Sequence, residues 1–207
     1  MPVGSAPPEP IAILTQASGA HLDDQPASAG LSVFEGERLQ TDAGGRAALR
    51  FGQSSLALIG SSEAALVRVS NGVHVDLSSG AVRFSANELQ MVEVHAEDAT
   101  IGSQIGRATD ATVGILQPKV LQIDARRGDL SFTYRQEFRV LPEGQVYRIY
   151  LDTPDRSETG ASIGVQVGAG SKVAYYILGA GAAGAGISWM TYGAIHSGNQ
   201  PISPAKP

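Results

Sequence analysis

The stretch that decides the fold reads Val73-His-Val-Asp-Leu77-Ser-Ser-Gly80-Ala-Val-Arg-Phe84. Apolar side chains occupy every second position on both sides of the Ser-Ser-Gly sequence. Because successive side chains of a β-strand point to opposite faces, this alternation predicts two strands, each with one buried face. Gly80 supplies the backbone freedom that a turn requires. The stretch therefore predicts a strand, a turn and a second strand that ends at Phe84.

The same pattern recurs at Leu121-Gln-Ile-Asp-Ala-Arg-Arg-Gly128-Asp-Leu-Ser-Phe132, which indicates two copies of one β unit. Shorter alternating stretches fill the rest of residues 10–151, and no segment before residue 173 keeps a 3.6-residue period over three turns. We therefore predict an all-β domain over residues 10–151. Its many short strands would form a sandwich, a roll or a small β-solenoid.

Composition excludes several classes of function. The chain has 207 residues, a formal net charge of −5 and no cysteine. The missing thiols exclude disulfides, thiolate metal sites and cysteine nucleophiles. The negative charge argues against a nucleic-acid partner, because such partners are met by basic surfaces.

The end of the chain has a different composition, since Lys206 is the only Asp, Glu, Lys or Arg after Lys172. Residues 173–195 are apolar, with tyrosines near one end and Trp189 near the other. As a helix they would span about 34 Å, enough to cross a bilayer. We predict a transmembrane helix over residues 173–195, which contacts membrane lipid and whose Gly and Ala spacing permits self-association.

The remaining segments follow from this division. Residues 1–9 form a Pro-rich lead that is expected to be disordered, residues 152–172 a Gly/Ser-rich linker, and residues 196–207 a short polar tail. A GxGxxG match starts at Gly179, but no acidic residue follows it at the spacing of a dinucleotide site. We therefore predict no cofactor. The first ten residues show no signal-peptide pattern.

Histidines next to carboxylates are the main candidates for chemistry. His74 and Asp76 share one face of a predicted strand, and such a pair can orient a base. Val73, Val75 and Leu77 must take the core side, so we predict that this face is solvated. His95, Glu97 and Asp98 offer nitrogen and oxygen donors to an ion; we predict an acidic turn there, with no metal and no catalytic residue.

Arg126 and Arg127 form the only Arg-Arg pair of the chain. In the repeated unit they replace Ser78 and Ser79, so they are expected to top an exposed turn. This position makes them candidates for contact with a partner.

Several motifs resemble the FecR-domain family. The stretch from Gly36 to Phe51 resembles its "GD.I.T...G.A.L.F" signature, residues 75–84 resemble "V.L..G.V.F", and Gly128-Asp-Leu130 resembles the start of the closing stretch. The family's "GT.F.V" element is missing from residues 101–113. The matching positions are Gly36, Leu39, Thr41, Gly45, Ala47, Leu49, Phe51, Leu77, Gly80, Val82, Phe84 and Gly128.

The resemblance implies an exported or periplasmic β-rich module, tethered to a membrane, that contacts another protein of the bacterial cell envelope. We therefore predict a non-enzymatic interaction or sensing module with an envelope protein as its partner. The alternative is a structural or polysaccharide-binding β domain at the cell surface. The helical segment through which such regulators control a sigma factor does not precede residue 10 here, so sigma-factor control is not predicted.

Overall fold

The computed structural model describes residues 9–152, 165–166 and 173–180. Within these ranges every regular element is a β-strand, which confirms the predicted all-β class. The strands are β1 (Ala12–Leu22), β2 (Gln25–Pro26), β3 (Ser32–Val33), β4 (Arg38–Phe51), β5 (Ser54–Val69), β6 (Gly72–Ala86), β7 (Met91–Ala96), β8 (Ala99–Ser103), β9 (Thr109–Gln117), β10 (Val120–Arg127), β11 (Leu130–Tyr134), β12 (Glu137–Leu141), β13 (Gln145–Leu151), β14 (Val165–Gln166) and β15 (Val173–Ala180).

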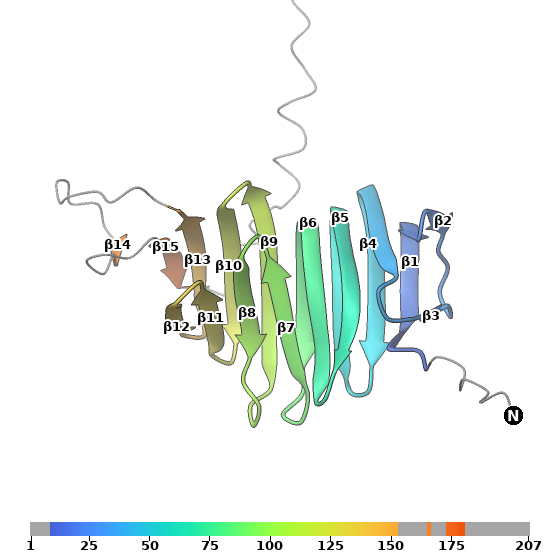
Figure 1. The fold of residues 1–207 in the computed structure, drawn as a ribbon, viewed down its shortest axis with the longest axis horizontal. Helices are drawn as coiled ribbons and strands as arrows, with labels where there is room; N and C mark the ends of the chain where they lie inside the picture. The colour runs from blue at the N-terminus through green and yellow to red at the C-terminus, as the bar shows by residue number, and fades with distance from the viewer. Residues whose placement is uncertain (1–8, 153–164, 167–172, 181–207) are drawn as a thin grey trace, which may run out of the picture.

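The strands form one continuous sheet that turns back on itself. Its order runs β12-β11-β8-β7-β6-β9-β10-β13-β15-β14, and β5, β4 and β1 continue from the other side of β6. Figure 1 shows β7, β8, β11 and β12 in front of β9, β10 and β13. The ring contact of Phe132 on β11 with Tyr175 on β15, at 5.6 Å between centroids, joins the two layers. The fold is therefore a two-layered roll with one core between its layers.

Strand β6 lies at the junction of the two layers. Its first half, from Gly72 to Leu77, pairs in parallel with β7, and its second half, from Ala81 to Ala86, pairs antiparallel with β9. A straight strand of 15 residues would span about 46 Å, yet only four residues connect Ala86 to Met91. Those residues reach at most about 17 Å, and the Met91 amide donates to Asn71 at 2.7 Å. The strand must therefore double back on itself.

The bend of β6 lies at Gly80, which has a φ of +74°. A Cβ at this position would lie 2.6 Å from the Ser61 carbonyl oxygen, so the neighbouring strand leaves room for hydrogen only. The β4–β5 and β5–β6 ladders shift register at the same level, between Gln40 and Arg46 and between Ile59 and Glu63. A register shift bends the strand that carries it. The bends of β4, β5 and β6 thus stack side by side and close this end of the roll.

The prediction for residues 73–84 is therefore right about the alternation and wrong about the turn. Val73, Val75, Leu77, Val82 and Phe84 are buried, as expected. The glycine lies inside one bent strand, because both halves stay hydrogen-bonded to β5. The second copy differs again, since β10 and β11 pair with different strands and belong to different layers.

The prediction of a transmembrane helix from residue 173 is wrong at its beginning. Val173 to Ala180 form β15, which pairs antiparallel with β13. The side chains of Val173 and Tyr175 belong to the core of the roll, and Ala174 between them is also buried. Among the described residues, none belongs to a helix of the length and apolarity that a bilayer crossing requires. Residues 181–195 lie outside the described part.

The sheet extends beyond residue 151, where the sequence predicts the end of the β domain. The sheet continues through β15, and two residues of the predicted linker, Val165 and Gln166, form β14 beside it. The unpaired backbone groups at the edge of a β-sheet can pair with a further strand. Composition alone does not reveal such pairing. Residues 153–164 and 167–172 of the linker, the polar tail and residues 1–8 of the N-terminal lead lie outside the described residues.

Candidate functional site

The positions that resemble the FecR signature are structural. Gly36, Gly80 and Gly128 have positive φ values, and Gly45 lies within the register shift of β4. The apolar members are buried in the core: Leu39, Ala47, Leu49, Phe51, Leu77, Val82 and Phe84. The positions that resemble the signature thus lie at glycines of positive φ, at a register shift and in the core of the roll.

Thr41 shows how a polar signature residue serves the fold. Its hydroxyl accepts a hydrogen bond from the Ser62 amide at 3.1 Å, and both residues are buried. The Ser62 hydroxyl in turn donates to the carbonyl oxygen of Ile59 at 2.6 Å and accepts from the Ala81 amide at 2.8 Å. Buried backbone groups that a bend removes from the sheet ladder need such partners. These two side chains satisfy the backbone at the bends of β4, β5 and β6.

The arginine pair lies at the end of β10 and is exposed, as predicted. The Arg126 guanidinium donates to the Asp124 carboxylate at 2.9 Å. Arg127 stands opposite Asp110 in the ladder with β9. Their contact with a partner stays a prediction.

The exposed face that carries His74 is richer than the sequence indicated. His74 and Asp76 point away from the core, as predicted. Strand β7 runs parallel to β6 in register, which places Glu93 beside His74 and His95 beside Asp76. The Asp76 carboxylate lies 3.2 Å from His74 Nε2 and 3.6 Å from His95 Nδ1, and Glu93 lies 3.7 Å from His74 Nδ1. Partial burial lowers the pKa of His95, and the neighbouring His74 contributes to the same shift with a smaller effect.

Glu97 and Asp98 are separated from this group. They form the turn between β7 and β8, as predicted, and turn towards Lys119. The hydrogen bond with the Lys119 ammonium lowers the pKa of Asp98. The side chain of His95 therefore lies beside Asp76 of β6, with which it pairs in the ladder, and not beside Glu97 and Asp98.

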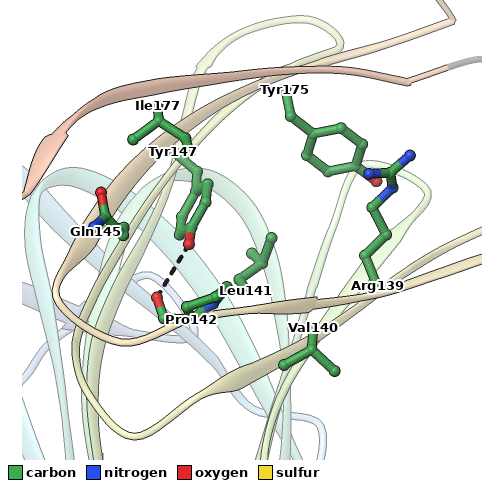
Figure 2. A pocket seen from close by; sticks show the side chains of 8 residues that line it. All are labelled: Arg139, Val140, Leu141, Pro142, Gln145, Tyr147, Tyr175 and Ile177. Carbon is green, nitrogen blue, oxygen red and sulfur yellow. Dashed lines mark hydrogen bonds between the residues drawn. The ribbon is translucent and has the colours of Figure 1, made fainter. Parts of the chain in front are cut away.

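The open end of the roll carries an apolar cavity. It lies between β12 of one layer and β13 and β15 of the other, and it has a volume of about 290 Å³. Figure 2 shows its lining, and we refer to it as the mouth cavity. The lining residues are Arg139, Val140, Leu141, Pro142, Gln145, Tyr147, Tyr175 and Ile177.

Two tyrosines set the polarity of the mouth cavity. The Tyr147 hydroxyl donates to the Pro142 carbonyl oxygen at 3.1 Å, as Figure 2 shows. The Tyr175 hydroxyl is buried and has no hydrogen-bond partner among the described residues. Burial raises the pKa of Tyr175 to about 12. The Arg139 guanidinium lies 4.7 Å from the centre of the Tyr175 ring.

The outer edge of β12 forms the rim of the mouth cavity. Within the described part of the chain, β12 pairs only with β11. Four large apolar side chains on β12 and β15 are exposed: Phe138, Val140, Ile177 and Leu178. A free backbone edge next to exposed apolar side chains can pair with another polypeptide segment.

Sequence reasoning did not single out the mouth cavity. The alternation of Phe138 and Val140 predicts a strand but not that it is an edge. The apolar run that contains Tyr175 predicts a transmembrane helix, whereas Tyr175 lies in strand β15. Only the pairing of β15 with β13 brings it to Arg139.

No family model matches the sequence, and no characterised protein matches it significantly. Two crystal structures of a candidate anti-sigma factor from Parabacteroides distasonis ATCC 8503 have similar folds over part of their length. The first, at 1.65 Å resolution, is 12% identical with a TM-score of 0.46, over 55% of this chain and 54% of that chain. The second, at 2.50 Å resolution, is 14% identical with a TM-score of 0.34, over 58% and 54%. This chain thus matches about half the length of those proteins.

Proposed function

We propose that this chain is a non-enzymatic interaction module that captures an extended segment of another protein at β12. The segment pairs with the free edge of β12 and places an apolar side chain in the mouth cavity. The observation that carries the proposal is the combination of three features: β12 pairs only with β11 among the described strands, Phe138 and Val140 are exposed, and Val140 lines a cavity.

The edge supplies affinity that does not depend on sequence. In strand addition, main-chain hydrogen bonds hold the incoming segment and pockets for alternate side chains select it. Strand β12 has five residues, which is enough for a short ladder. Natural proteins commonly protect such edges with charged side chains or a covering segment. Phe138, which is 65% exposed, does the opposite and favours contact with another protein.

The mouth cavity supplies selectivity. Its apolar lining from Val140, Leu141 and Ile177 accepts an aliphatic or aromatic side chain. The unpartnered Tyr175 hydroxyl can donate to a carbonyl or carboxylate of the incoming segment. Arg139 adds a positive charge at the entrance, so we expect an acidic residue close to the apolar one.

A polysaccharide fits the same surface less well. Sugars need several hydrogen-bonding groups together with aromatic stacking platforms, whereas the mouth cavity offers mainly aliphatic surface and one free hydroxyl. The motifs that resemble the FecR family support a place in the bacterial envelope and a sensing role. We keep both as parts of the proposal.

The test is selection of peptides from a displayed random library on the immobilised full chain. We expect enriched peptides that combine an apolar residue with an acidic one. Phe138→Lys and Ile177→Lys should each weaken their binding at least about tenfold, the usual cost of losing a central interface residue. Leu89→Lys is the matched control, since Leu89 is 80% exposed and lies far along the chain from β12.

Hydrogen exchange separates strand addition from simple adhesion. Bound peptide should protect the amides of residues 137–141, and the control variant should retain this protection. Failure to enrich peptides, or binding that the β12 and β15 variants do not change, would overturn the proposal. The proposal would also be overturned if the chain formed a dimer that Phe138→Lys dissociates, because a second copy of the chain would then occupy the edge of β12.

A further inference from the structure

A group of four polar side chains on β6 and β7 lies outside the mouth cavity and has no part in the proposed function. It consists of His74 and Asp76 on β6 and of Glu93 and His95 on β7, and we call it the β6–β7 cluster. All four side chains lie on the outer face of their strands, because the alternate residues are buried in the core. The parallel register of the two strands makes them a compact set.

The donor atoms of this cluster are spaced as a metal ion requires. His74, Asp76 and His95 each offer one atom, and these atoms lie within 4.8 Å of one another. Bonds of about 2.0–2.1 Å in a tetrahedral site place neighbouring ligand atoms roughly 3.3 Å apart. The Asp76 oxygen already lies 3.2 Å from His74 Nε2 and 3.6 Å from His95 Nδ1. His95 is exposed, so a small rotation of its side chain completes the set.

The charge of the cluster also favours a cation. Asp76 and Glu93 bring two carboxylates together, and in the described part of the chain no Lys or Arg pairs with either of them. Several other carboxylates of the roll have a cationic partner, as Asp110 has Arg83 at 2.8 Å. Opposite charge close to a carboxylate stabilises it. A dication would supply that charge here.

Glu93 has a separate role in this arrangement. It lies on the Nδ1 side of His74, at 3.7 Å, whereas Asp76 lies on the Nε2 side. Histidines that bind a metal commonly donate their other ring N–H to a carboxylate, which fixes the ring and its tautomer. Glu93 is thus placed to orient His74 rather than to bind the ion.

We propose that the β6–β7 cluster binds one Zn²⁺-class divalent ion through His74 Nε2, an Asp76 oxygen and His95 Nδ1. Glu93 is a positioning residue for His74. Two imidazoles with one carboxylate select zinc-class ions over Ca²⁺ and Mg²⁺, which prefer oxygen ligands. Three protein ligands leave the fourth position to water, as the exposed Asp76 and His95 permit. The ion would bridge β6 to β7, the only parallel pair among the described strands.

Calorimetric titration of the tag-free full chain with ZnCl₂ tests this site. We expect one ion per chain and no comparable binding of CaCl₂ or MgCl₂. Asp76→Asn and His95→Gln should lower the affinity for zinc by at least about tenfold, and Glu93→Gln by about tenfold with unchanged stoichiometry. His21→Gln is the matched control, because His21 also lies near a carboxylate, Asp42 at 3.8 Å, but has no second imidazole.

Nitrogen resonances of the unmodified protein give a readout that does not depend on variants. Added zinc should shift Nε2 of His74 and Nδ1 of His95 and leave the ring of His21 unchanged. Equal zinc binding by the control, Asp76→Asn and His95→Gln proteins would overturn the proposal. So would shifts confined to other histidines, or the absence of zinc binding to the unmodified chain.

Discussion

The two ends of the roll differ in whether the two layers are connected through continuous strands. At one end β4, β5 and β6 each bend and continue into the second layer, so no backbone edge is exposed between the layers there. At the other end the sheet order ends in separate strands, β12 in one layer and β14 beside β15 in the other, and the mouth cavity lies between β12 and the strands β13 and β15. At the bent end, Thr41 and Ser62 hydrogen-bond to the backbone, whereas at the open end, within the described part of the chain, the Tyr175 hydroxyl has no hydrogen-bond partner and β12 pairs only with β11. We therefore expect the bent end to contribute more to stability, and the proposed function assigns binding to the open end.

The largest expected effect comes from blocking a bend. Gly80→Val should lower the free energy of unfolding by roughly 3 kcal/mol or more, because the new side chain overlaps Ser61 and Ser62 at a positive φ. Urea denaturation measures the change. Gly144→Val is the control, since Gly144 has a φ of +77° with nothing within 4 Å. Equal losses in both variants would mean that φ alone, and not the packed bend, matters.

Removing the hydroxyl that satisfies the bend should have the next largest effect. Ser62→Ala leaves the Ala81 amide without its partner in a buried place, at a cost of about 1–3 kcal/mol. Thermal denaturation measures the loss. Thr15→Ala removes an exposed side-chain bond to Ala48 and should change the stability by less than about 0.5 kcal/mol. A Ser62 variant as stable as the Thr15 variant would contradict the assigned role.

The pH dependence of the free energy of unfolding reports on the open end of the roll, because the buried Tyr175 hydroxyl lies there. Folding raises the pKa of Tyr175 from 10.0 to about 12. The resulting stabilisation is fully present below pH 10 and is lost as the pH rises through about 12, because the unfolded chain ionises first. Tyr175→Phe should remove this part of the alkaline loss, which denaturation at a series of pH values would show. An unchanged alkaline profile in Tyr175→Phe would contradict the burial of the hydroxyl.

The smallest expected effect on stability comes from the rim of the mouth cavity. Phe138→Lys should change the free energy of unfolding by less than about 0.5 kcal/mol, because its side chain is 65% exposed. The same variant is expected to lose peptide binding, so urea denaturation and peptide titration should diverge. A large loss of stability would show that Phe138 belongs to the fold, and the contrast between the two ends would then weaken.

Alternation was sufficient to predict the all-β class and the buried positions between Val73 and Phe84. It could not distinguish a turn from a bend at Gly80, because both need a glycine and the difference lies in the pairing with β5 and β9. Nor could it identify Val173 to Ala180 as a strand, since a continuous apolar run fits a helix or a strand equally well.

The candidate sites were less accessible to sequence reasoning for the same reason. His74 and His95 are distant in the sequence, and only the parallel register of β6 and β7 makes them neighbours. Tyr175 and Arg139 meet across two layers. Long-range pairing is not written in any local pattern, so both sites needed the fold.

The doubled strands have a mechanical consequence. Since β4, β5 and β6 pass without a break from one layer to the other, the layers cannot slide past one another along this line. Any separation of the two layers therefore has to occur as a hinge rotation about the line of these bends. We therefore expect the distance between the two layers, on the side away from the bends of β4, β5 and β6, to change more easily than the other dimensions of the roll.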